Sequence, residues 1–528
     1  MPEPASADSH YPLDSMPWVP VLAKGGTTQH LGLRQLFIRA GEFTGLAVAS
    51  PPAASALLRI LSAIAARLTR LDRCDGDPGA WLDTRYGLLA AGDPFDPDAV
   101  HQYFDTHADG LRLYDPDRPF MQDARLADEC TSTSGINKLV LGRPSGNNQV
   151  FFGHFRDDEP VSLPSAEAVP HLLAQLAYGP SGQCTPRTAD GQKYGNTMAG
   201  PLRRVLSCHP LGRDLRESLL LGIPQPETWP DTKPGHDDLC PWEDPRPLPA
   251  LEPPGQSAGP MHLLTSRHQH AVLLHPSPDG THAVDATITW ALRANRPPFP
   301  DPYLIWDESK DGTPYPRRAD ANRAMWRDLD GLILQHRGGQ NRRPRIFDGL
   351  TGGNVPEDVF RHLRVVAHGF DQDGQTRDRS HFTAVTPVLC TLLSSSDDKE
   401  DRELARHLKD GREAAEHAAW RLEKALRDVW RAYTLPFEEG KPAGRTKKER
   451  NGGPWPEAAL AAYWPAAEER FWQLLDQEDF SGALPAFGAI ALDVFDGLTA
   501  AIAAQPRGAK AREGARGLVR SLLDADRT

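Results

Sequence analysis

Cysteine is scarce in this sequence, and the cysteines that are present lie far apart. The 528 residues contain six cysteines, and no two of them form a C-x-x-C pair. Structural zinc sites and dithiol redox centres usually need such pairs, and disulfide frameworks need a denser set. The spacing argues against a zinc site and against a disulfide framework, and it predicts reduced thiols.

Long apolar runs and a targeting signal are also missing. No stretch approaches the roughly 18 apolar residues of a membrane span. The N-terminal stretch MPEPASADSHYPLDS is polar and has no basic region followed by an apolar segment. We therefore expect a soluble, cytoplasmic protein that has no membrane partner.

Familiar catalytic signatures are absent as well. The sequence contains no GxSxG, HExxH, GxxxxGK(S/T) or strand-associated GxGxxG motif. The histidines of SRHQH, SCHP and RVVAHGF lack partners at the spacing of a metal site, so we expect ordinary packed or exposed side chains. We predict no catalytic residue, no metal site and no cofactor, although a site assembled from distant residues would leave no such signature.

Positive charge is in the minority. The chain has 59 lysines and arginines against 71 aspartates and glutamates, which gives a formal net charge of -12. The surface as a whole therefore repels phosphate, and any contact with nucleic acid requires local basic patches.

The sequence does contain enough apolar residues for large folded cores. Its hydrophobic fraction of 39% and charged fraction of 25% are typical of soluble globular proteins, and its length predicts two or three domains. Residues 1–390 mix strand-like runs with helical periodicity, which predicts an α+β domain with irregular loops and without a repeating βαβ unit. Residues 391–528 repeat apolar residues at helical intervals in four segments, which predicts a C-terminal four-helix bundle.

Three glycine-rich polar loops carry basic or aromatic neighbours. They are GINKLVLGRPSGNNQVFFGH, YGPSGQCTPRTADGQKYGN (residues 178–196) and GLTGGNVPED (residues 349–358). Glycine lets backbone approach a ligand closely, and exposed amides can bind phosphate or base edges. Together the loops indicate a binding surface, whereas any one of them alone is more simply an ordinary surface loop.

Two basic groups are candidates for a path along DNA. One contains Arg342, Arg343 and Arg345, and the other is the loop EEGKPAGRTKKERNGG with Lys447 and Lys448. The basic loop is either a phosphate-contacting patch or a solvated, exposed run of charge.

The order of several segments resembles the CasA family, the large subunits of the type I-E CRISPR surveillance complexes called Cascade. The resemblance is carried by PWVPV, LGLRQLF, DPDRPFMQD, NKLVLGRPSGNNQVFFGH, LPSAEAVPHLLAQLAYGPSGQ and WDESKDGTPYP, followed by the helical C-terminal region. The match covers nearly the whole chain. Its specificity comes from the ordered combination rather than from any single motif.

The resemblance implies a non-catalytic subunit of an RNA-guided complex. Members of the family inspect double-stranded DNA for a protospacer-adjacent motif, help to separate the strands so that the guide RNA can pair, and recruit a helicase-nuclease. The implied partners are CRISPR RNA, double-stranded target DNA, the helicase-nuclease, and the backbone, guide-end-capping and small subunits of Cascade.

The resemblance also implies roles for individual residues. Phe152 looks like the aromatic residue of the family's mobile loop, which docks on the guide-RNA end and on neighbouring subunits, and Asn147 and Asn148 lie in the same loop. The family's turn that reaches the minor groove of the motif matches Gly179–Gln183, with Gly182 as the nearest match to its glycine.

Two further positions complete the implied DNA contacts. Arg296, ahead of WDESKDG, is the candidate for a basic residue that faces the groove. The family's strand-separating wedge uses a glutamine after paired glycines, whereas Asn354 follows Gly352 and Gly353 in this sequence. Either Asn354 or the stiff Val355-Pro356 pair acts as the wedge, or the motif preference differs, or the correspondence shifts by a few residues.

Two other classes of function compete with this hypothesis. A stand-alone hydrolase or transferase with a site between the two domains would turn over substrate as a single chain and would group perturbed ionisable residues in a pocket. A scaffold that only joins other subunits would direct its glycine-rich loops at proteins and contact no DNA.

Overall fold

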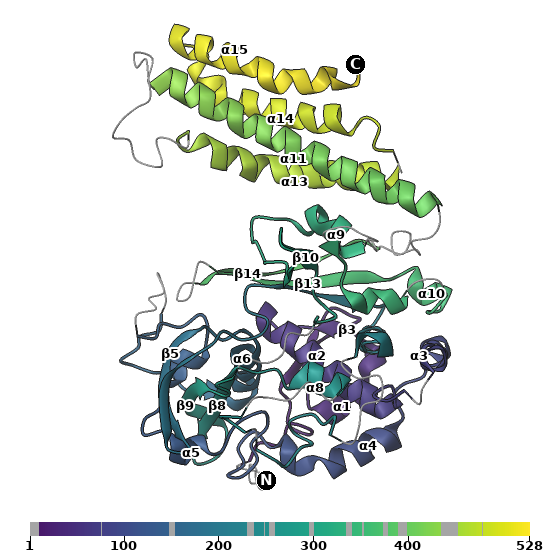
Figure 1. Cartoon of the computed structure of the whole chain (residues 1–528), viewed down its shortest axis with the longest axis vertical. Helices are drawn as coiled ribbons and strands as arrows, with labels where there is room; N and C mark the ends of the chain where they lie inside the picture. The colour runs from purple at the N-terminus through teal and green to yellow at the C-terminus, as the bar shows by residue number, and fades with distance from the viewer. Residues whose placement is uncertain are drawn as a thin grey trace. The chain divides into compact units, whose positions relative to one another are not determined.

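The chain divides into two compact units (Figure 1). The mixed unit comprises Met1–Arg323 and Gly331–Ser394, and the helical unit comprises Ala324–Asp330 and Ser395–Thr528. The predicted boundary after residue 390 lies outside the described residues. The computed structural model describes residues 10–74, 77–146, 154–229, 237–247, 249–252, 259–294, 300–333, 341–350, 353–372, 378–388, 399–434, 452–477 and 479–527.

Small antiparallel sheets form the β structure of the mixed unit. In its described part the strand orders are β2-β1-β3, β14-β13-β7, β4-β9-β8, β11-β10-β12 and β5-β6. Every pairing within these sheets is antiparallel, which confirms the predicted α+β class without βαβ crossovers. The strands are Val19–Ala23 (β1), Thr28–Leu31 (β2), Phe43–Leu46 (β3), Leu163–Pro164 (β4), Gly182–Ala189 (β5), Gln192–Thr197 (β6), Leu206–Leu211 (β7), His270–Pro276 (β8), His282–Trp290 (β9), Trp306–Glu308 (β10), Pro314–Pro316 (β11), Asn341–Arg342 (β12), Arg364–Gln372 (β13) and Asp378–Val385 (β14).

Helix α2 (Pro51–Thr69) is the central helix of the mixed unit. It starts with Pro51 and Pro52, whose restricted φ suits the first helical turn, and most of its residues are buried. The other described helices before residue 394 are α1 (Leu33–Ile38), α3 (Pro78–Ala91), α4 (Pro97–Thr106), α5 (Leu126–Glu129), α6 (Ser165–Tyr178), α7 (Leu215–Leu221), α8 (Pro260–Thr265), α9 (Leu329–Ile333) and α10 (Glu357–Phe360). The first two residues of α9 belong to the helical unit.

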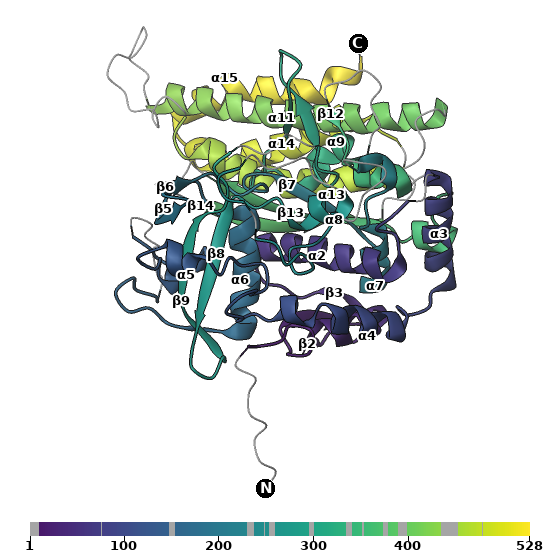
Figure 2. The same cartoon turned by 60° about the horizontal axis from the view of Figure 1, so that its bottom comes forward.

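Helix α6 lies along the hairpin of β8 and β9 (Figure 2). Its buried residues include Leu172, Leu173 and Leu176, which anchor the helix in the core. The helix ends at Tyr178 and β5 begins at Gly182. The fold thus places the predicted DNA-contacting turn between a packed helix and a two-stranded hairpin.

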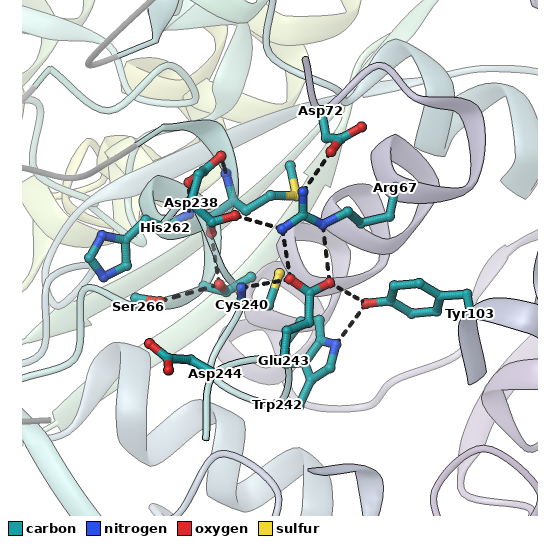
Figure 3. A network of polar contacts seen from close by, with 12 residues as sticks. Arg67, Asp72, Tyr103, Asp238, Cys240, Trp242, Glu243, Asp244, His262 and Ser266 are labelled. Atoms are coloured by element: carbon teal, nitrogen blue, oxygen red, sulfur yellow. Dashed lines mark hydrogen bonds and ion pairs between the residues drawn. The ribbon is translucent and has the colours of Figure 1, made fainter. Parts of the chain in front are cut away.

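A buried polar network joins α2 to the segment that precedes α8 (Figure 3). Arg67 forms a bidentate contact with Glu243, with Nε–Oε1 and Nη2–Oε2 distances of 3.1 and 2.7 Å, and its Nη1 donates to Asp72 at 2.5 Å. Tyr103 Oη donates to Glu243 Oε1 at 2.8 Å. Burial alone would raise the pKa of Glu243, but the hydrogen bonds and charge of Arg67 outweigh burial and hold that pKa below its usual value.

Two helices of the described residues are long and apolar enough to cross a membrane by length and composition alone. They are Pro51–Thr69 and Ala483–Ile502. The core helix of a globular domain passes the same test, and 78% of the apolar window of Pro51–Thr69 is buried. These two helices are therefore weak evidence for a membrane span.

Four long helices form most of the helical unit (Figure 1). They are α11 (Lys399–Thr434), α13 (Trp455–Asp476), α14 (Ala483–Thr499) and α15 (Pro506–Arg520). The predicted helical C-terminal region is confirmed. On α11 the residues Leu408, Ala415, Leu422, Leu426 and Val429 are at most 2% exposed, so the predicted periodicity marks the buried face.

A segment from the middle of the chain completes the helical unit. The Trp326 ring lies 4.6 Å from that of Phe471 and 6.1 Å from that of Trp464, measured between centroids. The guanidinium carbon of Arg327 lies 3.8 Å from the Trp464 centroid. The predicted bundle did not include this segment, because the periodicity of the C-terminal region carries no information about it.

Candidate nucleic-acid interface

Gly179 ends helix α6 at a position that has no room for a side chain. Its amide donates to the Gln175 carbonyl oxygen at 2.9 Å, and its own carbonyl oxygen accepts from the Gly200 amide at 2.9 Å. A Cβ atom at Gly179 would lie 2.5 Å from the Gln175 carbonyl oxygen and 2.7 Å from His270 Cε1. Packing therefore requires glycine here.

Gly182 is a glycine for a different reason. Its φ is +131°, and no heavy atom lies within 4 Å of the place where a Cβ would be. Only glycine adopts this backbone region readily. Gly182 pairs with Thr197, and the exposed Gln183 pairs with Asn196. The turn thus presents open backbone at the start of the β5–β6 hairpin.

Two arginines lie beside this turn. Arg203 Nη1 donates to the Tyr178 carbonyl oxygen at 2.6 Å, and its Nε donates to Gln372 Oε1 at 2.7 Å. Arg204 Nε donates to the same glutamine oxygen at 3.2 Å. Arg203 is buried whereas Arg204 is half-buried, so Arg203 fixes the end of α6 and Arg204 is the more accessible cation.

His270 supports the turn from strand β8. Its Nε2 lies 3.0 Å from the Pro180 carbonyl oxygen. Burial, with smaller contributions from the charges of Arg203 and Lys138, lowers the pKa of His270 to about 4. The ring is therefore neutral at pH 7 and donates from Nε2. Lys138 is half-buried and forms no ion pair among the described residues, so its charge adds to the positive potential here.

Arg293 is a cation that sequence reasoning missed. Its Nη1 donates to the Asn196 carbonyl oxygen at 2.9 Å, next to the Gln183 pair of the hairpin. Its guanidinium carbon lies 4.2 Å from the Tyr194 ring centroid. The predicted Arg296 lies outside the described residues, and the only sequence signal for Arg293 was its position in the same ALRANR run.

The predicted guide-end loop is only partly described. Asn147, Asn148 and Phe152 belong to residues 147–153, which lie outside the described part of the chain. Their roles stay predictions.

The residues on either side of that loop are fixed by buried contacts. Asn137 Nδ2 donates to the Arg156 carbonyl oxygen at 2.8 Å, and Arg143 Nη1 donates to the Val161 carbonyl oxygen at 2.5 Å. Arg143 is 7% exposed, and its guanidinium carbon lies 4.1 Å from the Phe155 ring centroid. The two ends of the loop are thus linked to one rigid framework.

The third glycine-rich loop starts from a buried arginine contact. Arg85 Nη2 donates to the Gly349 carbonyl oxygen, and the guanidinium carbon lies 5.0 Å from the Trp81 ring centroid. Arg85 is 0% exposed, and burial lowers its pKa to about 10. Arg85 holds the entry to this loop from a helix 264 positions away in sequence.

The predicted wedge residues differ in accessibility. Gly353 has a φ of +83° with open space beside it, and Asn354 is half-buried. Val355 is 4% exposed and Pro356 is buried at the start of α10. Within residues 353–356, solvent therefore reaches Gly353 and Asn354 but not the other two residues.

The basic candidates are not equivalent. Arg343 is 4% exposed, and its Nε forms an ion pair with Asp348 Oδ1 at 2.7 Å. This buried, paired guanidinium is not available for a phosphate contact in this conformation. Arg345 is half-buried and donates to the Glu227 carbonyl oxygen. The backbone of Arg342 pairs with Trp306 in β12. Lys447, Lys448 and the side chain of Arg342 lie outside the described residues.

One cluster in the mixed unit resembles a nucleophile–base pair. Ser55 Oγ and Ser207 Oγ each lie 3.1 Å from His209 Nε2. Ser55, Ser207 and His209 are at most 3% exposed, and burial lowers the pKa of His209 well below its usual value. No substrate could reach a hydroxyl in this position. Within the described ranges, no group of three or more His, Cys, Asp or Glu side chains is arranged to hold a metal ion.

Known proteins are similar to this chain in sequence and in fold. The family model of CRISPR-associated protein Cse1 matches residues 13–487. The chain belongs to the Cse1 family. A CasA/Cse1 protein of Thermus thermophilus is 32% identical over 209 residues, which cover 39% of this chain and 38% of that protein, so the alignment spans less than half of this relative of the Cse1 family.

Two solved structures extend the match to the whole fold. A chain from a CRISPR RNA-guided surveillance complex is 42% identical, with a TM-score of 0.83 and coverage of 97% of this chain and 99% of that one. Cse1 from Acidimicrobium ferrooxidans is 23% identical, with a TM-score of 0.71 and coverage of 100% and 99%. The second likeness shows the fold alone.

Proposed function

We propose that this chain is the large, non-catalytic subunit of a type I-E CRISPR RNA-guided surveillance complex. The Cse1 family match supports this, as does the 42% identity to a chain of such a complex over 97% of the sequence. Its proposed partners are CRISPR RNA, double-stranded target DNA, the backbone, guide-end-capping and small subunits, and a helicase-nuclease. Its proposed location is the cytoplasm.

In that complex the turn Gly179–Gln183 reads the protospacer-adjacent motif. The observation that carries this step is the contrast between the two glycines, because Gly179 is locked against α6 while Gly182 leaves open backbone at φ +131°. In the minor groove A·T and T·A pairs look alike, whereas G·C pairs add a guanine amino group. Backbone that approaches closely excludes this amino group. Arg204 and Arg293 supply positive charge nearby for the phosphates.

The loop with Asn147, Asn148 and Phe152 contacts the guide-RNA end and neighbouring subunits. The buried contacts of Asn137 and Arg143 support this role, because a short loop between fixed ends loses less conformational entropy when it is ordered on assembly. An aromatic ring at its end provides a stacking or packing anchor.

Asn354 is the proposed wedge between the separating strands. The burial of Val355 and Pro356 favours Asn354 over the alternative, since a wedge side chain must reach the duplex. Strand separation then allows R-loop formation, after which the complex recruits the helicase-nuclease. The rival hypothesis of a stand-alone hydrolase or transferase gains no support from the buried Ser55–His209 cluster.

The test is Gly182→Ala in a complex reconstituted with guide RNA and the partner subunits. A Cβ at φ +131° strains the backbone and adds bulk to the groove-facing turn. We expect the preference for motif-bearing over motif-scrambled duplex to fall about tenfold, measured at several salt concentrations so that the phosphate contribution is separated.

Gly191→Ala is the matched control. Gly191 lies at the other end of the same hairpin, also at positive φ (+76°) and also with open space beside it. It should cost similar stability and leave motif preference unchanged. Equal effects of the two variants, or a wild-type complex with no motif preference, would contradict the proposed role.

A further inference from the structure

Helix α11 exposes a tryptophan in a charged surface. Trp420 is 52% exposed, and in the described part of the helical unit no other large hydrophobic side chain is exposed. Protein interfaces usually present several apolar side chains together. A single exposed apolar side chain is common on protein surfaces, so the neighbours of this indole decide what it can bind.

Cationic side chains lie next to this indole. Lys424 Nζ is 5.2 Å and the Arg421 guanidinium carbon 5.8 Å from the Trp420 ring centroid. Arg421 Nε donates to His417 Nε2 at 3.2 Å, so the imidazole is the acceptor and holds the guanidinium beside the ring. Trp420 and Lys424 are four residues apart, as are His417 and Arg421, so these side chains meet on successive turns of α11.

The acids of α11 near this cluster are paired with other cations. Neither Arg421 nor Lys424 forms an ion pair with an acid in the part of the chain that the structure describes. The acid–cation pairs are Glu413 with Lys409 and Arg412, Glu416 with Arg412 and Arg327, Glu423 with Arg427, and Asp428 with Arg431. The charges of Arg421 and Lys424 are therefore left for an anionic ligand.

We infer that Trp420, Arg421 and Lys424 bind single-stranded nucleic acid, with an unpaired base stacked on the indole and the adjacent phosphates contacted by the two cations. Aromatic side chains stack on any base, and basic neighbours follow the backbone. A base inside a duplex is already stacked on both faces, so the indole selects single strands. The inference uses residues of the helical unit alone and does not rest on motif recognition by the Gly179–Gln183 turn.

The experiment measures binding of labelled single-stranded DNA, single-stranded RNA and duplex DNA to the full chain by fluorescence anisotropy. Trp420→Ala should lower single-strand affinity about tenfold, while Trp420→Phe, which keeps an aromatic face, should retain most of it. Duplex affinity should change less than about twofold, since a paired base gains little from the indole. The DNA and RNA arms identify which strand the site prefers.

The contribution of charge has its own matched control. Lys424→Ala should reduce the slope of log affinity against log salt by about 0.7, as expected for one lost phosphate contact to a single strand. Lys409→Ala, on the same helix but paired with Glu413, should change the slope less. Unaltered thermal unfolding will show that the variants fold.

Three outcomes would overturn the inference. The wild-type chain could fail to bind single strands at low salt, or Trp420→Ala could weaken duplex and single strand equally. Trp420→Ala could also leave strand binding intact and instead weaken assembly with a partner subunit, which would assign the surface to a protein.

Discussion

The two units are stabilised in different ways. In the mixed unit, buried arginines connect segments that are far apart in sequence: Arg59 Nη1 lies 2.7 Å from Asp301, and Arg187 contacts both Asp123 and Glu129, at 2.9 and 2.5 Å. In the helical unit, the buried face of α11 is apolar, and the ion pairs of this helix are half-buried, as for Arg412 and Glu416, or exposed, as for Lys409 and Glu413. Helices with a continuous apolar face associate through that face, whereas irregular segments need specific polar contacts to set their positions.

The difference predicts where each unit is vulnerable. A buried ion pair adds little net stability when it is intact, because desolvation offsets the attraction, but removal of one partner leaves a buried charge. A packed apolar side chain stabilises the fold because its apolar surface is removed from water and because it fills space that would otherwise be a cavity. Single substitutions should therefore destabilise the two units by different mechanisms.

Arg67→Ala should give the largest loss of stability. It leaves Glu243 buried without a cation and leaves Asp72 with only the exposed Arg73, whose Nε lies 3.6 Å from Asp72 Oδ1. We expect the free energy of unfolding to fall by about 3–5 kcal/mol in urea unfolding experiments. Arg361→Ala is the control, because Arg361 pairs with Glu357 at about 70% exposure on both sides and should cost less than about 1 kcal/mol. Similar losses for both variants would remove the distinction between buried and exposed pairs.

Leu422→Ala tests the apolar side of the comparison. Leu422 is 0% exposed on α11, and its truncation should lower the free energy of unfolding of the helical unit by about 2–4 kcal/mol, followed by far-UV circular dichroism. Leu484→Ala on α14, where the side chain is half-buried, should cost clearly less. A cost below that of Leu484→Ala would contradict the apolar interior as the source of stability.

Asp238→Asn should give the smallest effect and one that depends on pH. Burial, partly offset by hydrogen bonds from the His262 and Met261 amides, raises the pKa of Asp238 to about 6. Because the folded state binds this proton more tightly than the unfolded state, the stabilisation is complete below about pH 4 and is lost as pH rises through 6. The wild-type stability relative to Asp238→Asn should thus fall by at most about 3 kcal/mol over this window. A flat difference would show that the carboxyl does not titrate there.

Much of the fold could be predicted because its signals are local. The apolar residues of the stretch 54–71 recur at helical spacing, which predicts a helix there, and α2 spans Pro51–Thr69. The four helical segments predicted within residues 391–528 correspond to α11, α13, α14 and α15. Segment Ala324–Asp330 escaped prediction, because its Trp326 packs on residues that follow much later in the chain.

The candidate site residues were predicted from the resemblance of the glycine-rich loops to those of the family. The residues that hold these loops in place were not predicted to do so. Gly182 and Asn354 stood out because glycine-rich turns are visible in a sequence. Arg143, Arg293 and Arg85 act through contacts to backbone carbonyl groups of distant residues, and no spacing rule encodes such contacts.

By itself, the sequence determined the mixed and helical character of the two regions, the periodic face of α11 and the ordered segments that resemble one family, since all of these depend on residues close together along the chain. Only the tertiary structure decided that Gly179 is enclosed while Gly182 is open, and that Arg343 is internal. It also decided that Trp420 is exposed beside Arg421 and Lys424, which have no acid partner among the described residues. The physical reason is that the space around a Cβ atom, the burial of a side chain and the pairing of charges depend on which distant segments come into contact. The local sequence pattern does not determine those contacts.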